Sequence, residues 1–118
     1  MSTTLFRLAF WAALVVTLWF AWYPAPPTLL SSDKWQHMLA FAVLTTLYFL
    51  AYPKVRWITV FASMAALGAL IEVVQAIPFI HRDADVHDWY ADMSAIVVTM
   101  ILVAVVRRIW PRSGSVAG

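Results

Sequence analysis

The side chains that could do chemistry in this chain fall into three short groups separated by long apolar runs. The groups contain acids, bases and one amide: Asp33, Lys34 and His37, then Glu72 and Gln75, then Arg82, Asp88 and Asp92. Residues three or four positions apart share one face of a helix, so helical structure would bring the members of a group together. Histidine and carboxylates so placed are suited to proton transfer, to binding a polar headgroup, or to holding a divalent ion.

The composition indicates that these groups belong to a membrane protein. Of the 118 residues, 64% are hydrophobic, whereas an ordinary soluble domain is roughly half apolar. A helix needs about 20 apolar residues to cross a bilayer, and four runs approach that length, at about 6–23, 35–52, 57–77 and 88–106. We therefore expect an all-α fold, with one domain over 1–118 built as an integral membrane bundle of four transmembrane helices.

The first run is interpreted as a span and not as a cleaved signal peptide. It is longer than the usual apolar core of a signal peptide, and no small-x-small cleavage site follows it.

The basic residues predict the orientation of the bundle. Six of the eight lie in the N-terminal segment, in the link between the second and third runs, or in the C-terminal tail: Arg7, Lys54, Arg56, Arg107, Arg108 and Arg112. Because Lys and Arg stay on the cytoplasmic side, we expect both termini in the cytoplasm of a bacterium. The start of the second run, the end of the third and the start of the fourth then share one external level of the cytoplasmic membrane.

Glu72 is the polar residue that is costliest to place in the bilayer. Counted by helical rise, it lies roughly 8 Å inside the end of its run, and His37 and Asp92 lie roughly 5 to 6 Å inside theirs. A carboxylate at bilayer depth costs on the order of 2 to 3 kcal/mol, so it normally faces protein or water. Ala65 and Gly68 have the small-residue spacing that lets a neighbouring helix approach closely. We therefore expect His37, Glu72 and Asp92 to meet, and they are the candidate catalytic residues.

Each candidate also has a purely structural interpretation. Glu72 could hold the helices together by pairing with Arg82 or Lys34. Gln75 fits a hydrogen-bond donor between helices. Asp88 fits an N-cap of the fourth span.

The ordered motifs resemble those of VanZ-like membrane proteins. They are Asp33-Lys34-x-x-His37 with Phe41, then Glu72-x-x-Gln75, then Arg82 followed by Asp88-Trp89-x-x-Asp92. The resemblance implies a four-helix membrane protein from a family whose founding member confers low-level resistance to the glycopeptide teicoplanin. Two features depart from the family pattern. The last motif position, often Asn, is Asp92, and Ser94 and Ala95 stand where a glycine-rich stretch is usual.

Three functions stay open at this point. The resemblance implies a nonenzymatic envelope protein that binds an amphiphile, such as a membrane lipid, a lipid-linked precursor or a glycopeptide-type molecule. The ligand-binding residues would then be Asp33, Lys34, His37, Glu72, Gln75, Arg82, Asp88 and Asp92. The second function is a membrane-embedded enzyme acting on lipid headgroups, with His37 as general base and Glu72 or Asp92 as acid or metal ligand. The third is a proton or ion pathway, although the inner halves of the spans offer no ionisable residue to complete a crossing.

Other partners are predicted from what the sequence lacks. No cofactor or metal is expected, because there is no His-x-x-x-His or comparably spaced ligand set and no cysteine. The sequence has no stripe of basic residues of the kind that binds nucleic acid, so no nucleic-acid partner is expected. Four short helices bury little interior, so a homodimer is expected to be compatible with the fold.

Overall fold

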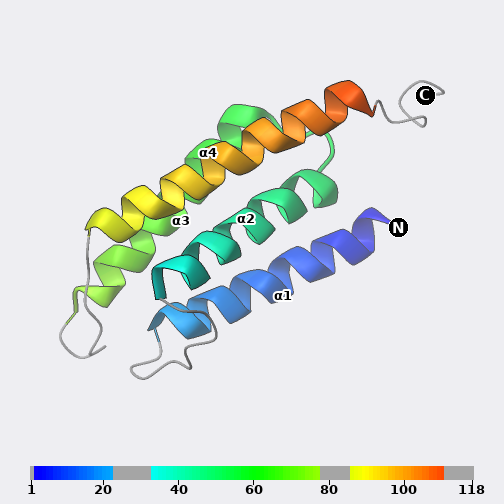
Figure 1. Ribbon diagram of the computed structural model, residues 1–118. Helices are drawn as coiled ribbons and strands as arrows, with labels where there is room; N and C mark the ends of the chain where they lie inside the picture. The colour runs from blue at the N-terminus through cyan, green and yellow to red at the C-terminus, as the bar shows by residue number, and fades with distance from the viewer. Residues whose placement is uncertain (1, 23–32, 78–85, 111–118) are drawn as a thin grey trace.

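The computed structural model describes residues 2–22, 33–77 and 86–110, and for Asp33 and Lys34 it describes the backbone only. Over these ranges the chain forms four helices and no strand: α1 (Thr3–Trp22), α2 (Asp33–Ala51), α3 (Trp57–Gln75) and α4 (Val86–Ile109). The end of α1, the start of α2, the end of α3 and the start of α4 lie at one end of the bundle (Figure 1). We call this the site end. The opposite end, where α1 begins and α4 finishes, is called the basic end.

Three of these helices, α1, α3 and α4, are long and apolar enough to cross a membrane. The apolar part of α2 is shorter and runs from Trp35 to Ala51. Large apolar side chains such as Trp11, Leu39, Leu70 and Ile101 are exposed on all four helices. An outer surface of this kind is favourable against lipid tails and would be a liability in water. The prediction of an all-helical chain is confirmed.

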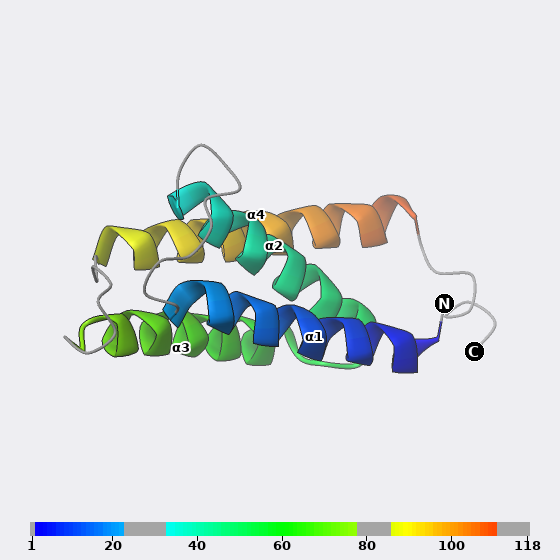
Figure 2. The same cartoon turned by 90° about the horizontal axis from the view of Figure 1, so that it is seen from below.

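α2 forms the centre of the bundle. Figure 2 shows it running obliquely between α1 and α4, the two helices against which it packs most extensively. Its side chains Phe41, Leu44 and Phe49 are buried, because three neighbouring helices surround this one. The central position of α2 matters for function because α2 carries His37 into the interior.

The helix ends agree with the predicted ones to within about three residues, and prolines account for two of them. α2 ends two residues before Pro53 and α3 ends three residues before Pro78. Proline cannot donate the helical hydrogen bond, and it disfavours helical backbone in the residue before it.

α4 begins earlier than predicted, and this changes the position of Asp88 in the helix. This helix begins at Val86, so Asp88 lies inside its first turn. The prediction that Asp88 is the N-cap of the fourth span is therefore wrong. A carboxylate in the first turn interacts favourably with the positive end of the helix dipole, and that accounts for an acid at this position.

The basic end is held together by two arginines. The Nε of Arg7 donates a hydrogen bond to the carbonyl oxygen of Ala51 at 3.0 Å, which links α1 to the end of α2. The guanidinium of Arg107, in the last turn of α4, lies 5.2 Å from the ring centre of Phe49 and 5.7 Å from that of Trp57. Both distances are within the range of cation–π attraction. These contacts fix the far ends of all four helices relative to one another.

Candidate functional site

His37, Glu72 and Asp92 meet inside the site end, as the sequence predicts. One potential ligand atom from each side chain lies within 4.8 Å of those from the other two. Asp92 is fully buried, His37 is 8% exposed, and Glu72 is half-buried with one carboxylate oxygen out of contact with solvent. We call these three residues the polar cluster. Each comes from a different helix, so the cluster exists only when α2, α3 and α4 are packed together.

Gly68 and Ala65 allow α3 and α4 to approach closely beside the polar cluster. The indole Nε1 of Trp89 donates a hydrogen bond to the carbonyl oxygen of Ala65 at 3.2 Å. A Cβ at position 68 would lie 3.2 Å from Cδ1 of Trp89 and 3.6 Å from Oδ2 of Asp92. The absence of a side chain at Gly68 therefore leaves room for the indole, whereas the Asp92 carboxylate would be at an ordinary van der Waals distance. The predicted role of this small-residue spacing is confirmed.

Gln75 points its amide toward α1. Its Nε2 donates a hydrogen bond to the carbonyl oxygen of Ala21 at 2.8 Å, and both residues are almost completely buried. The last four carbonyls of a helix have no partner within that helix, and Ala21 lies in the last turn of α1. Gln75 therefore closes the end of α1 against α3, in agreement with its interpretation as a donor between helices.

An apolar groove adjoins the polar cluster. It has a volume of about 300 Å³ and lies between α1 and α2. We call it the α1–α2 groove. Its lining is mostly aliphatic, but it also contains Gln36 and His37, so one side chain belongs to both the groove and the cluster.

The remaining predicted site residues have different outcomes. Arg82 lies outside the described residues. Asp33 and Lys34 lie in the first turn of α2, one turn before His37, and their side chains are outside the description. Asp88 lies one turn before Asp92 on α4 and is half-buried. Together these positions place the first turns of α2 and α4 next to the polar cluster.

No family model, curated protein or solved structure matches this chain.

The buried ionisable side chains of the described part of the bundle, His37 and Asp92, lie at the site end. The other buried polar side chains of the described part are Thr45, Gln75 and Thr99, and none of these ionises. The described part thus contains no buried chain of ionisable groups from one end to the other. This distribution suits a site that is entered from one end.

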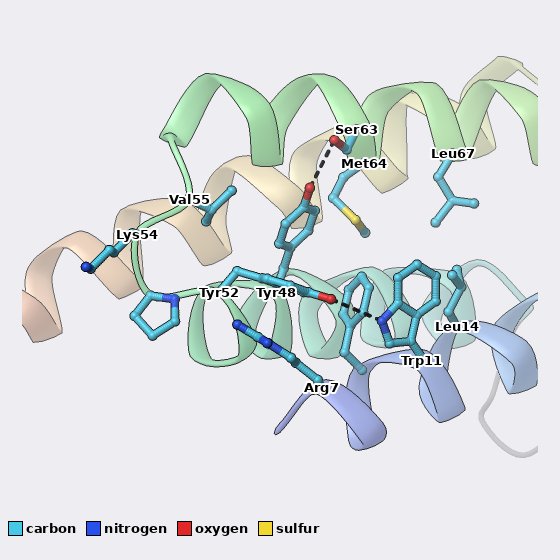
Figure 3. A pocket seen from close by; sticks show the side chains of 12 residues that line it. Arg7, Trp11, Leu14, Tyr48, Tyr52, Lys54, Val55, Ser63, Met64 and Leu67 are labelled. Carbon is cyan, nitrogen blue, oxygen red and sulfur yellow. Dashed lines mark hydrogen bonds between the residues drawn. The ribbon is translucent and has the colours of Figure 1, made fainter. Parts of the chain in front are cut away.

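A second cavity lies at the basic end, and the sequence interpretation missed it. It has a volume of about 820 Å³ and opens between α1, α2 and α3. Figure 3 shows Arg7 and Lys54 toward one end of it and Leu14 and Leu67 toward the other. We call it the basic-end pocket. The sequence held one signal of this pocket. Arg7 and Trp11 lie four positions apart, and so do Tyr48 and Tyr52.

Proposed function

We propose that this chain is a VanZ-like multi-pass protein of the bacterial cytoplasmic membrane. Its polar cluster binds the polar headgroup of an amphiphile at the extracytoplasmic face. The observation that carries this proposal is the convergence of His37, Glu72 and Asp92 next to an apolar groove that shares His37. Polar groups at the end of an apolar groove match a molecule with a polar head and a hydrocarbon tail. A lipid or a lipid-linked envelope precursor has this form.

The proposed topology has four spans with both termini in the cytoplasm. The apolar part of α2, Trp35–Ala51, extends about 26 Å at 1.5 Å per residue, at the short end of the range of about 17 to 25 residues for a transmembrane helix. Five of the six basic residues in the described ranges belong to the opposite end of the bundle from the polar cluster: Arg7, Lys54, Arg56, Arg107 and Arg108. The sixth, Lys34, lies in the first turn of α2 at the site end. The preference of Lys and Arg for the cytoplasm then puts the cluster on the outer side.

Binding at this site would contribute to envelope homeostasis or to glycopeptide resistance. The test is to purify the protein from a bacterial membrane and to identify bound amphiphiles by lipid mass spectrometry. One amphiphile enriched over the bulk membrane, and lost in His37→Ala, is expected. His87→Ala is the matched control, because it removes an exposed histidine from the first turn of α4. A lipid profile equal to that of the bulk membrane would contradict the proposal.

The cellular role has a separate test. Expression of the wild-type chain in a susceptible bacterium is expected to raise the tolerated teicoplanin concentration, and Glu72→Gln at equal expression is expected to abolish the rise. Equal tolerance with and without the wild-type chain would contradict the role in resistance and leave the binding experiment to decide the rest.

An enzyme is the second candidate, and the same geometry favours it. An imidazole and two carboxylates within 4.8 Å of one another are a set that can remove and return a proton. In that case His37 is the general base and Glu72 or Asp92 the acid, with a headgroup as substrate. Turnover of the co-purified amphiphile by the wild-type protein, absent in His37→Ala, would favour the enzyme over the binding protein.

A further inference from the structure

We infer that the polar cluster is a binding site for a divalent transition-metal ion of the Zn²⁺ or Mn²⁺ class. The inference rests on the proposed function only in using the same three residues. The ligand set is one imidazole nitrogen and two carboxylate oxygens, supplied by α2, α3 and α4. Imidazole favours zinc and similar ions, whereas carboxylates also suit manganese. A mixed set of this kind is typical of neither calcium nor copper(I).

The distances fit an ion after a small closing movement. Metal–ligand bonds of about 2.0 to 2.2 Å place the donors of a tetrahedral site roughly 3.4 Å apart. The donors of the polar cluster lie within 4.8 Å of one another. An ion must therefore draw the donor atoms together by no more than about 1.4 Å. Glu72 has the longest side chain of the three and is half-buried, so it has the most freedom to move.

Charge balance also favours a cation. Asp92 is completely buried and Glu72 is half-buried, and two carboxylates this close repel each other. A divalent ion with two carboxylates and a neutral imidazole forms a group of zero net charge, which relieves that repulsion.

Asp92 lies where α3 and α4 approach closely: a Cβ at Gly68 would be in ordinary van der Waals contact with its Oδ2, at 3.6 Å. Three protein ligands leave a fourth position of the ion open, as in catalytic zinc sites. A phosphate or hydroxyl oxygen of a headgroup in the α1–α2 groove is the chemistry that would complete it.

The experiment measures metal content and affinity in the purified full-length protein. After chelation, the protein is titrated with Zn²⁺ and separately with Mn²⁺, and bound metal is counted by mass spectrometry. One ion per chain is expected. His37→Ala, Glu72→Gln and Asp92→Asn should each weaken binding at least about 100-fold, since even the loss of an outer partner of a ligand costs 10- to 100-fold. The matched control His87→Ala removes an exposed histidine just outside the cluster and should retain wild-type affinity.

Two further measurements keep the inference testable if a variant fails to fold. Co²⁺ bound to the wild-type protein should show the visible absorption of a nitrogen- and oxygen-ligated ion, and it should be displaced by Zn²⁺. Affinity should also fall as the pH is lowered, because protons compete for the imidazole and the carboxylates. Less than a tenth of an ion per chain in the wild type, or unchanged affinity in all three variants, would overturn the inference. Metal without a co-purified amphiphile supports the metal site alone, and an amphiphile without metal supports the proposed function alone.

A separate observation carries a second inference, at the basic-end pocket. We propose that this pocket binds an anionic phospholipid of the surrounding membrane. The Cζ of Arg7 lies 4.7 Å from the ring centre of Tyr52, whose hydroxyl accepts a hydrogen bond from Nε1 of Trp11 at 3.2 Å. This network holds the guanidinium at the mouth of the pocket. The Lys54 side chain is exposed nearby.

The arrangement of the pocket matches the two parts of a lipid. Arg7 and Lys54 provide positive charge at one end, and Leu14 and Leu67 provide an apolar wall at the other (Figure 3). Basic pockets between transmembrane helices on the cytoplasmic side are suited to anionic headgroups.

The test reconstitutes the protein in nanodiscs of phosphatidylcholine with phosphatidylglycerol and measures retained lipid by native mass spectrometry. Phosphatidylglycerol is expected to be enriched over its bulk share. Lys54→Gln and Arg7→Gln should each reduce the preference for phosphatidylglycerol about fivefold, because each cation near the membrane surface contributes about 1 kcal/mol. The matched control is Arg108→Gln, an exposed arginine in the last turn of α4. Retention in proportion to the bulk lipid, or an equal effect of the control, would overturn this proposal.

Discussion

Gly68 offers the sharpest test of how α3 and α4 build the site. A Cβ there would lie 3.2 Å from Cδ1 and 3.4 Å from Nε1 of Trp89, closer than the optimal carbon–carbon separation of about 3.5 to 4.0 Å. The indole cannot withdraw freely, because Nε1 is hydrogen-bonded to the carbonyl oxygen of Ala65. Gly68→Ala therefore displaces the indole and weakens that bond.

Opposing contributions decide the effect of Gly68→Ala on stability. Alanine in place of glycine inside a helix stabilises it by up to about 1 kcal/mol. Overpacking a filled contact costs about 1 to 3 kcal/mol, and loss of the Trp89 hydrogen bond costs about 1 kcal/mol more. We expect the free energy of unfolding to fall by about 1 kcal/mol or somewhat more.

A double-mutant cycle in detergent micelles isolates the contact. Denaturant unfolding is measured for the wild type, Gly68→Ala, Trp89→Ala and the double variant. In the Trp89→Ala background the indole is gone, so Gly68→Ala should raise the free energy of unfolding by up to about 1 kcal/mol. The substitution thus changes sign between the two backgrounds. Stabilisation in both would refute the close contact on which the argument depends.

Three other predictions follow from single contacts or from the topology. Gln75→Leu should lower the free energy of unfolding by about 1 to 3 kcal/mol, because it leaves a buried carbonyl at the end of α1 without its donor; unchanged cation affinity is expected in the folded fraction. Arg107→Gln should lower the melting temperature, because each lost cation–π contact is worth about 0.5 to 1 kcal/mol. Arg108→Gln removes an exposed cation and should leave the melting temperature unchanged. Equal shifts in the two variants would contradict the role of Arg107. Because the chain has no cysteine, Ser32→Cys and Ser2→Cys can each be labelled alone in intact cells. The first should react with a membrane-impermeant reagent and the second only after permeabilisation, and reaction of both from outside would refute the proposed topology.

Much of the fold follows from patterns that act locally along the chain. Apolar length predicts the helices, and Pro53 and Pro78 set two of their ends to within a few residues. The meeting of His37, Glu72 and Asp92 also follows from the sequence. Three consecutive helices that alternate in direction must bring the start of α2, the end of α3 and the start of α4 to one end, and helical spacing gives the depth of each side chain.

The features that could not be predicted depend on contacts distant in sequence that involve backbone atoms or shape. The partner of Gln75 is the carbonyl of Ala21, and every residue has a carbonyl, so nothing in the sequence marks this one. The basic-end pocket requires Arg7 and Tyr52 to meet across two helices. Arginine near a span end is interpreted as a topology signal whether or not it lines a cavity.

The energetics of the polar cluster fit the proposed ligand-binding role. Replacing a buried ionic group with apolar residues of similar volume is often neutral or stabilising by about 1 to 4 kcal/mol. Hydrogen bonds between membrane helices average only about 0.6 kcal/mol. Asp92 is completely buried, and in the proposed topology an acid at bilayer depth costs on the order of 2 to 3 kcal/mol. Under the proposed function, a bound cation or headgroup would offset part of this cost, in addition to the interactions that Asp92 makes within the protein.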